Sequence, residues 1–198
     1  MTHLGPPERI SSRHLRAVRV ALDDFEASID VIERWGGELA RRLTAGARLL
    51  TAGNGGSAAH AEHLAAEFVG RYATERAPFS AVALHCGGVT ISALTNDYGA
   101  DEMFARQVRA HGRPGDVLVA FSTSGHSPNV VAAAGAACAQ GLTVWSLTGP
   151  GPNPLTEVSS DSVAVRAPAT PTVQEIHQIA VHLLCEAFDE SLTRSASS

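Results

Sequence analysis

The chain has 198 residues, of which 44% are hydrophobic and 18% charged, so it can bury a core and is not a disordered chain. Its formal net charge is -5 and its 15 Lys and Arg residues do not cluster, which excludes a strongly basic nucleic-acid-binding protein. No apolar run reaches the ~18 residues of a membrane-spanning helix, and the N-terminus has no signal-peptide pattern. The cysteines, Cys86, Cys138 and Cys185, form no C-x-x-C pair and are expected to be small buried groups in a reducing compartment. We therefore expect a cytoplasmic protein without nucleic-acid or membrane partners.

Residues 1–198 are expected to form a single domain, because the sequence contains no low-complexity linker and no internal repeat. Its ends, 1–8 and 194–198, are expected to be flexible. Over 10–44, apolar residues recur at spacings of three and four, which predicts one helix or a helix pair that precedes the rest of the fold.

From residue 48 onward, short apolar runs alternate with helical stretches. Strands are expected at 48–52, 80–84, 117–121, 142–147 and 162–165, and helices at 57–69, 127–140 and, closing the chain, 171–192. This alternation predicts an α/β fold with a parallel sheet covered by helices on both faces and an N-terminal helical extension. Ligands of such folds bind at the carboxyl ends of the strands.

Two polar loops follow expected strands and lead directly into helices. One reads Gly53-Asn54-Gly55-Gly56-Ser57 and the other Ser122-Thr123-Ser124-Gly125-His126-Ser127. Glycines let the backbone approach a ligand closely, and hydroxyls with free N–H groups at a helix start form a neutral cradle for phosphate. Either loop alone is more typical of an ordinary helix cap, but two such loops after parallel strands favour a ligand site. Neither matches a nucleotide-binding fingerprint, so no nucleotide cofactor is expected.

Two helices carry groups suited to proton transfer or metal binding. His63 and Glu67 are four residues apart and hence share one helix face, which suits a metal, a base with its partner, or a simple exposed polar face. On the closing helix, Gln174 and His182 are separated by about 12 Å along the axis. One straight helix does not easily bring both to one metal. Either Gln174 lies at a frayed helix start, or ligands come from different subunits.

Together these motifs resemble the phosphoheptose isomerases of the sugar isomerase (SIS) fold group, in order over about residues 10–190. The resemblance rests on the two loops and His63-x-x-x-Glu67, and on four further blocks: Gly70-Arg71-Tyr72, Thr95-Asn96-Asp97-Tyr98-Gly99, Gly115-Asp116-Val117-Leu118, and Gln174-Glu175-Ile176-His177 with His182.

This resemblance implies conversion of sedoheptulose 7-phosphate to D-glycero-D-manno-heptose 7-phosphate, in heptose biosynthesis. It also implies a five-stranded parallel sheet in the flavodoxin-like order, a homotetramer, and one zinc ion per subunit. Glu67 would be the general base and His182 its acid partner. The zinc ligands would be His63, Glu67, Gln174 and His182. The substrate would contact Asn54, Gly55, Gly56, Ser57, Glu67, Arg71, Asn96, Asp97, Ser122, Thr123, Ser124, Ser127 and Gln174.

The residue types fit this chemistry independently. Ketose–aldose isomerisation needs a base near C1 and C2 and an acid or metal near the two oxygens, which a carboxylate and an imidazole supply. Related SIS proteins that tetramerise and contact a replication initiator lack this pair, so its presence here favours an enzyme. An isomerase for another sugar phosphate remains an alternative.

Overall fold

The computed structural model describes residues 10–196. The expected flexible segment 1–8 and the last two residues lie outside this range, whereas residues 194–196 continue the closing helix.

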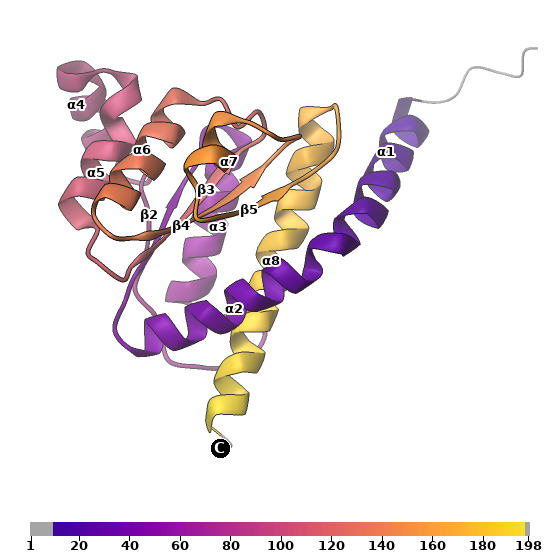
Figure 1. The fold of residues 1–198 in the computed structure, drawn as a ribbon, viewed down its shortest axis with the longest axis horizontal. Helices are drawn as coiled ribbons and strands as arrows, with labels where there is room; N and C mark the ends of the chain where they lie inside the picture. Colours follow the sequence, from indigo (N-terminus) through magenta and orange to yellow (C-terminus); the bar gives the residue numbers. More distant parts are fainter. Residues whose placement is uncertain (1–9, 197–198) are drawn as a thin grey trace, which may run out of the picture.

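Five parallel strands form the centre of the protein (Figure 1). They are β1 (Leu49–Ala52), β2 (Ala81–Ala83), β3 (Val117–Ser122), β4 (Thr143–Thr148) and β5 (Asp161–Ala164). Their order is β2-β1-β3-β4-β5, which confirms the expected sheet and its flavodoxin-like order. β1 and β3 are buried along their whole length, as their uninterrupted apolar runs predict for strands covered on both faces.

Helices cover both faces of the sheet. One face carries α1 (Ile10–Phe25), α2 (Ile29–Thr44), α3 (Gly56–Val69) and α8 (Thr170–Ala196), with the 3-10 turn η1 (Glu26–Ser28) joining the first two helices. The opposite face carries α5 (Met103–His111), α6 (Pro128–Ala139) and α7 (Pro154–Val158), beside which lie α4 (Gly88–Tyr98) and η2 (Ala100–Glu102). No helix within 10–196 is long and apolar enough to span a membrane.

A tryptophan pair anchors the N-terminal helices to the sheet. The rings of Trp35 on α2 and Trp145 on β4 are stacked, with centroids 4.9 Å apart and planes inclined by 4°. The Trp35 indole N–H also donates to Asp161 Oδ2 on β5, at 2.9 Å. Both tryptophans are fully buried, and this stacked pair ties the N-terminal extension to the α/β unit.

The contact between α2 and α8 depends on Gly36. A Cβ atom at this position would lie 2.5 Å from the Cβ of Ala187 and 2.8 Å from its carbonyl carbon. Only a glycine therefore permits the two helix backbones to approach this closely. The packing holds α8, the helix that carries half of the candidate proton-transfer groups, against the N-terminal extension.

The expectation of three buried cysteines is correct only for Cys185 on α8. Cys86 is exposed in the loop after β2. Cys138 is exposed on the outer side of α6, whose core-facing residues are the alanines at 133, 134 and 137. An alanine-rich helix shows little hydrophobic contrast between its faces, so the sequence pattern did not distinguish the outward position.

His177 connects α8 to the end of β4. Its ring is fully buried, and its Nε2–H donates to the carbonyl oxygen of Thr148, at 3.1 Å. Its Nδ1 has no hydrogen-bond partner. Burial is the main cause that lowers the pKa of His177 to about 4; the hydrogen bond to the Thr148 carbonyl opposes this effect, and the neighbouring His60 adds to it. The ring is therefore neutral in the folded protein near pH 7.

This buried histidine predicts a loss of stability on mild acidification. The unfolded chain binds a proton at a pKa of about 6.5 and the folded chain only at about 4, so unfolding takes up a proton between these values. His177 should therefore lower the free energy of unfolding as the pH falls below 6.5, by about 2 kcal/mol at pH 5. Urea denaturation from pH 7 to pH 5 measures this dependence. It should be clearly weaker in His177→Gln and unchanged in His111→Gln, an exposed control. An equal dependence in all three proteins would contradict the assignment.

Candidate active site

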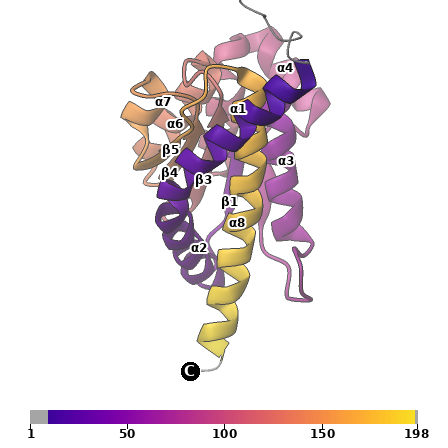
Figure 2. The same ribbon diagram turned by 90° about the vertical axis from the view of Figure 1, so that its right-hand side faces the viewer.

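The candidate site is built along two parallel helices, α3 and α8, which lie side by side (Figure 2). Gln174, Gln178 and His182 recur every fourth residue and therefore form one row on α8. Gln174 contacts Gly56, where a Cβ atom would lie 2.3 Å from its Nε2. One turn further on, Gln178 Oε1 lies 2.9 Å from His60 Nδ1, and His182 follows beside His63. The row thus brings polar groups of α8 against the matching turns of α3.

His63, Glu67 and His182 form one cluster in the middle of this helix pair. His63 Nε2 lies 3.1 Å from His182 Nε2 and 3.3 Å from Glu67 Oε1. Gln178 Nε2 lies 3.0 Å from the same nitrogen of His182. When His182 Nε2 accepts a hydrogen bond from the Gln178 amide, it carries no proton. A proton on His63 Nε2 then lies near two acceptors, His182 Nε2 and Glu67 Oε1. The cluster can therefore hold or pass a proton between a carboxylate and an imidazole.

Two contacts of this cluster have the separations expected of neighbouring ligands of one divalent metal ion. Two ligands of tetrahedral zinc, with bonds of about 2.0–2.2 Å, lie about 3.3 Å apart. The separations from His63 Nε2 to His182 Nε2 and to Glu67 Oε1 are 3.1 and 3.3 Å. Imidazole nitrogen and carboxylate oxygen are both ligands that zinc accepts. His63 is thus close enough to each of the other two residues, but the ligand atoms of all three do not lie within 4.8 Å of one another in this chain, so a shared ion requires Glu67 and His182 to move closer together.

The fourth expected ligand, Gln174, is not part of this cluster. α8 is helical from Thr170, so Gln174 lies inside the helix and not at a frayed start. Its eight-residue separation from His182 corresponds to about 12 Å along the axis. The amide beside His182 in this chain belongs to Gln178. Sequence reasoning did not single out Gln178, although its spacing of four residues from His182 places it on the same helix face.

A buried ion pair fixes the end of α3 that carries Glu67. Arg76 pairs with Asp189 of α8 at 2.8 Å, and both side chains are almost fully covered. Its guanidinium also donates to the backbone carbonyl of Glu67, at 2.8 Å. The charged group lies among three aromatic rings, those of Phe68, Phe79 and Phe188. Arg76, which sequence analysis did not identify, thereby links the backbone of the expected base to α8.

The serine-rich loop after β3 is preorganised by its own hydrogen bonds. Ser122 Oγ lies 3.1 Å from Ser127 Oγ and accepts from the N–H of Gly125, also at 3.1 Å. Gly125 adopts a φ of +66°, and a Cβ there would lie 2.0 Å from the Asn153 side chain, so only glycine fits. Ser127 caps α6 with an extended backbone and no side-chain cap bond. Thr123 and the exposed Ser124 complete a loop of hydroxyls at a helix N-terminus, which suits a phosphate group.

A pair of amides joins this loop to the glycine-rich one after β1. The Asn54 amide donates to Asn129 Oδ1 at 2.8 Å, and the Asn129 amide returns a bond to Asn54 Oδ1 at 3.0 Å. Gly55 has a φ of +54°, which allows the sharp turn before α3, and Ser57 is buried behind it. The two loops expected to bind the substrate therefore lie side by side at one edge of the sheet, where β1 and β3 end. Asn129 was missed because nothing local distinguishes it from other residues in the first turn of a helix.

Three expected substrate-contact residues make local side-chain contacts, none of them a hydrogen bond or ion pair to the two loops. Asn96 and Asp97 are exposed on α4, where the Asn96 amide donates to Asp97 Oδ1, at 2.9 Å. Arg71 is exposed just after α3 and pairs with Glu75 at 3.6 Å. The hydrogen bonds and ion pairs of these three side chains are made with residues close to them in the sequence. Within one chain, the structure gathers the two loops and the helix cluster, but not these residues.

The sequence and the structure of this chain both match those of one family of known proteins. A family model described as the SIS domain matches residues 13–149. A phosphoheptose isomerase of Streptomyces coelicolor is 59% identical over 181 residues, which cover 91% of this chain and 78% of that protein. One of Rhodospirillum rubrum is 49% identical over 156 residues, covering 79% of this chain and 83% of its own.

Solved structures agree. A phosphoheptose isomerase from Neisseria gonorrhoeae superposes with a TM-score of 0.83 at 36% identity, covering 92% of this chain and 97% of its own. One from Francisella tularensis gives a TM-score of 0.85 at 28% identity, covering 90% and 96%. The site described above thus lies in an enzyme fold shared with sugar-phosphate isomerases, and the chain belongs to the phosphoheptose isomerase family of SIS-domain proteins.

Proposed function

We propose that this isomerase converts sedoheptulose 7-phosphate to D-glycero-D-manno-heptose 7-phosphate, with Glu67 as the base and His182 as its acid partner. The observation that carries the proposal is the cluster in which His63 contacts both Glu67 and His182. Relatives named phosphoheptose isomerase at up to 59% identity support the same reaction.

The reaction moves one proton between C1 and C2 and another between the two oxygens. Glu67 takes the carbon-bound proton, leaving an enediolate, and returns it to the neighbouring carbon. His182 transfers a proton to and from the oxygens. The Glu67 side chain is only 19% exposed, and Arg76 bonds to its backbone carbonyl, so the carboxylate has a defined position with little access for water. Each positioned group of this kind contributes typically ~10²–10⁴-fold in rate.

The phosphate is proposed to lie on the hydroxyls of Ser122, Thr123, Ser124 and Ser127. The sugar is proposed to contact the glycine-rich loop, through Asn54, Gly55, Gly56 and Ser57. The paired amides of Asn54 and Asn129 hold this loop beside the serine-rich one. Neutral hydroxyls and backbone N–H groups bind a phosphate without adding a lysine that would compete for the ionised base.

Replacing Glu67 by Gln should reduce kcat/KM for sedoheptulose 7-phosphate by at least ~10²-fold, because the amide keeps the shape but cannot take the proton. Glu190→Gln is the matched control, since Glu190 is exposed on α8 and pairs with Arg194 at 3.9 Å. It should retain wild-type turnover. Equal turnover by Glu67→Gln and wild type would assign the base elsewhere. Absence of turnover by the folded wild-type protein would favour another sugar phosphate or the binding-protein alternative.

We propose further that zinc is held by His63, Glu67 and His182 within a cytoplasmic homotetramer. When bound, zinc would polarise the substrate oxygens and stabilise the negative charge that develops on them. The fourth ligand is then Gln174 of a second copy, because Gln174 of the same chain lies about 12 Å from His182 along α8. The same assembly would bring Asn96, Asp97 and Arg71 of neighbouring copies toward the substrate.

Large apolar side chains left on the surface support self-association. On α1, Ile10, Leu15 and Val20 are 77%, 55% and 63% exposed, and Val89 on α4 is 86% exposed. No other part of the described chain covers these four side chains. Such surfaces are typical of interfaces between subunits. Light scattering should give four times the chain mass of 20.6 kDa, and a monomer would contradict the tetramer.

Zinc added to chelator-treated protein should raise the melting temperature of wild type more than that of His182→Ala, because the variant loses one ligand of the cluster. At a zinc concentration about 100 times the Kd, binding at one site contributes about 2.7 kcal/mol. His111→Ala, which removes an exposed histidine outside the cluster, should behave as wild type. Gln174→Ala and Gln178→Ala distinguish the two candidate amide ligands. Identical rises in wild type and His182→Ala would contradict the metal assignment.

A further inference from the structure

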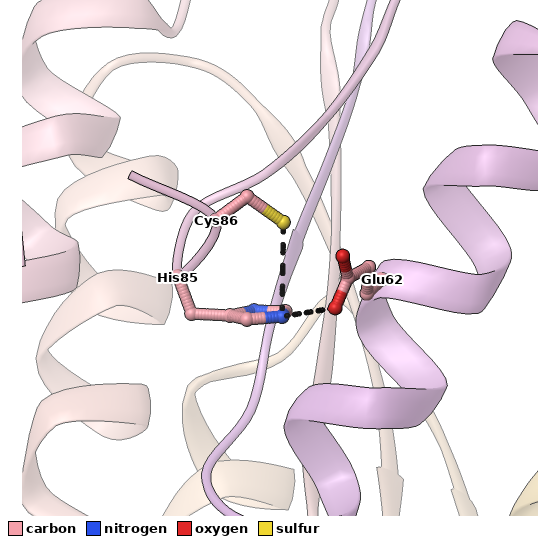
Figure 3. Close-up of side chains that lie close together, drawn as sticks. All are labelled: Glu62, His85 and Cys86. Carbon is pink, nitrogen blue, oxygen red and sulfur yellow. Dashed lines mark hydrogen bonds and ion pairs between the residues drawn. The ribbon is translucent and has the colours of Figure 1, made fainter. Parts of the chain in front are cut away.

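A second cluster of potential metal ligands lies on another side of α3, between this helix and the edge of the sheet. Figure 3 shows Glu62 of α3 facing His85 and Cys86, which follow β2. His85 Nε2 lies 3.5 Å from Glu62 Oε2 and 3.8 Å from Cys86 Sγ, and one ligand atom from each residue lies within 4.8 Å of the other two. Among residues 10–196, no other three His, Cys, Asp or Glu side chains bring their ligand atoms this close together.

This cluster is separate from the candidate active site. Successive residues of a helix differ by about 100° around its axis, so Glu62 and the adjacent His63 point in different directions. His63 contacts α8, whereas Glu62 contacts the loop after β2. The chemistry differs too, because the expected active-site ligands include no thiol.

The separations in this cluster are compatible with a shared cation, and the one between His85 and Glu62 is long for a direct hydrogen bond. An N–H···O bond is usually 2.7–3.2 Å long, shorter than the 3.5 Å between His85 and Glu62. Around tetrahedral zinc, with bonds of about 2.3 Å to sulfur and 2.0–2.2 Å to nitrogen and oxygen, neighbouring ligand atoms lie about 3.4 Å (N and O) and about 3.6 Å (N and S) apart. The observed values of 3.5 and 3.8 Å are close to both.

The backbone holds two of the three ligands in place. Leu84 is fully buried and donates its N–H to the carbonyl of Thr51, at 2.9 Å. Cys86 donates its own N–H to the carbonyl of Ala83, at 3.2 Å. The His85 side chain is only 18% exposed, and its Nδ1 is buried without a hydrogen-bond partner. The ring is mostly buried and its Nε2 lies near Glu62 and Cys86, which are both exposed and reachable by an ion.

We propose that Glu62, His85 and Cys86 form a second divalent-cation site, suited to Zn²⁺, with a fourth position open to water. A thiolate and an imidazole favour zinc over Mg²⁺ or Ca²⁺, which prefer oxygen ligands. Zinc binding displaces the thiol proton of Cys86. A redox role for Cys86 is less suitable, because burial and the Glu62 charge raise the pKa of its thiol and so reduce the reactive thiolate.

Cobalt(II) tests this site because thiolate ligation gives an intense charge-transfer absorption that oxygen and nitrogen ligands do not. Full-length protein freed of metal and titrated with Co²⁺ should develop this band with one equivalent bound at the site. Cys86→Ser should abolish it, and the exposed serine should not impair folding. Cys138→Ser is the matched control, since Cys138 is also exposed, and it should keep the band. No band in wild type, or a band that persists in Cys86→Ser, would overturn the proposal.

Two further variants separate this site from the proposed catalytic metal. Glu62→Gln, which keeps the thiol, should weaken Co²⁺ binding measured by the same band. His182→Ala should leave the band unchanged, because the catalytic cluster supplies no thiolate. Loss of the band in His182→Ala would instead indicate a thiolate at that cluster, where Cys185 lies one turn further along α8, and would contradict the second site.

Discussion

The arrangement of the site depends on the packing of α8 along α3. Because the two helices run in the same direction, the row Gln174, Gln178 and His182 meets successive turns of α3. The contact of His182 with His63, at 3.1 Å, joins residues 119 positions apart in the chain. A rotation of either helix by one residue, about 100°, would separate the imidazole from the carboxylate. The register of this helix pair is therefore the constraint from which the proton-transfer geometry follows.

Several buried contacts maintain that register. Arg76 and Asp189 join α8 to the end of α3, at 2.8 Å, with the guanidinium among aromatic rings. His177 attaches the first turns of α8 to β4. Gly36 lets α2 pack closely against the later turns of α8. None of these residues is proposed to touch the substrate. Their role is to hold Glu67 and His182, the proposed base and acid, within the small positional tolerance that catalysis requires.

Much of this architecture could be predicted from local pattern. Alternating apolar runs and helical periods located five strands, the N-terminal helices and the helices α3, α6 and α8, but not α4, α5 or α7. Glycine and serine content identified both loops. The features that escaped prediction depend on long-range pairing. The bonds between Asn54 and Asn129 cross 75 residues, and Gln178 rather than Gln174 lies beside His182 because α8 is a single straight helix. The exposure of Cys86 likewise follows from how its loop leaves β2, which composition does not encode.

In the proposed mechanism, Glu67 and His182 act as one unit on one substrate. A double-mutant cycle on kcat/KM with Glu67→Gln, His182→Asn and the double variant tests it most directly. Groups that serve the same transition state give strongly non-additive losses. We predict that the double variant is within about tenfold of the more impaired single variant. Losses that multiply fully would show that the two residues act independently and would contradict the account.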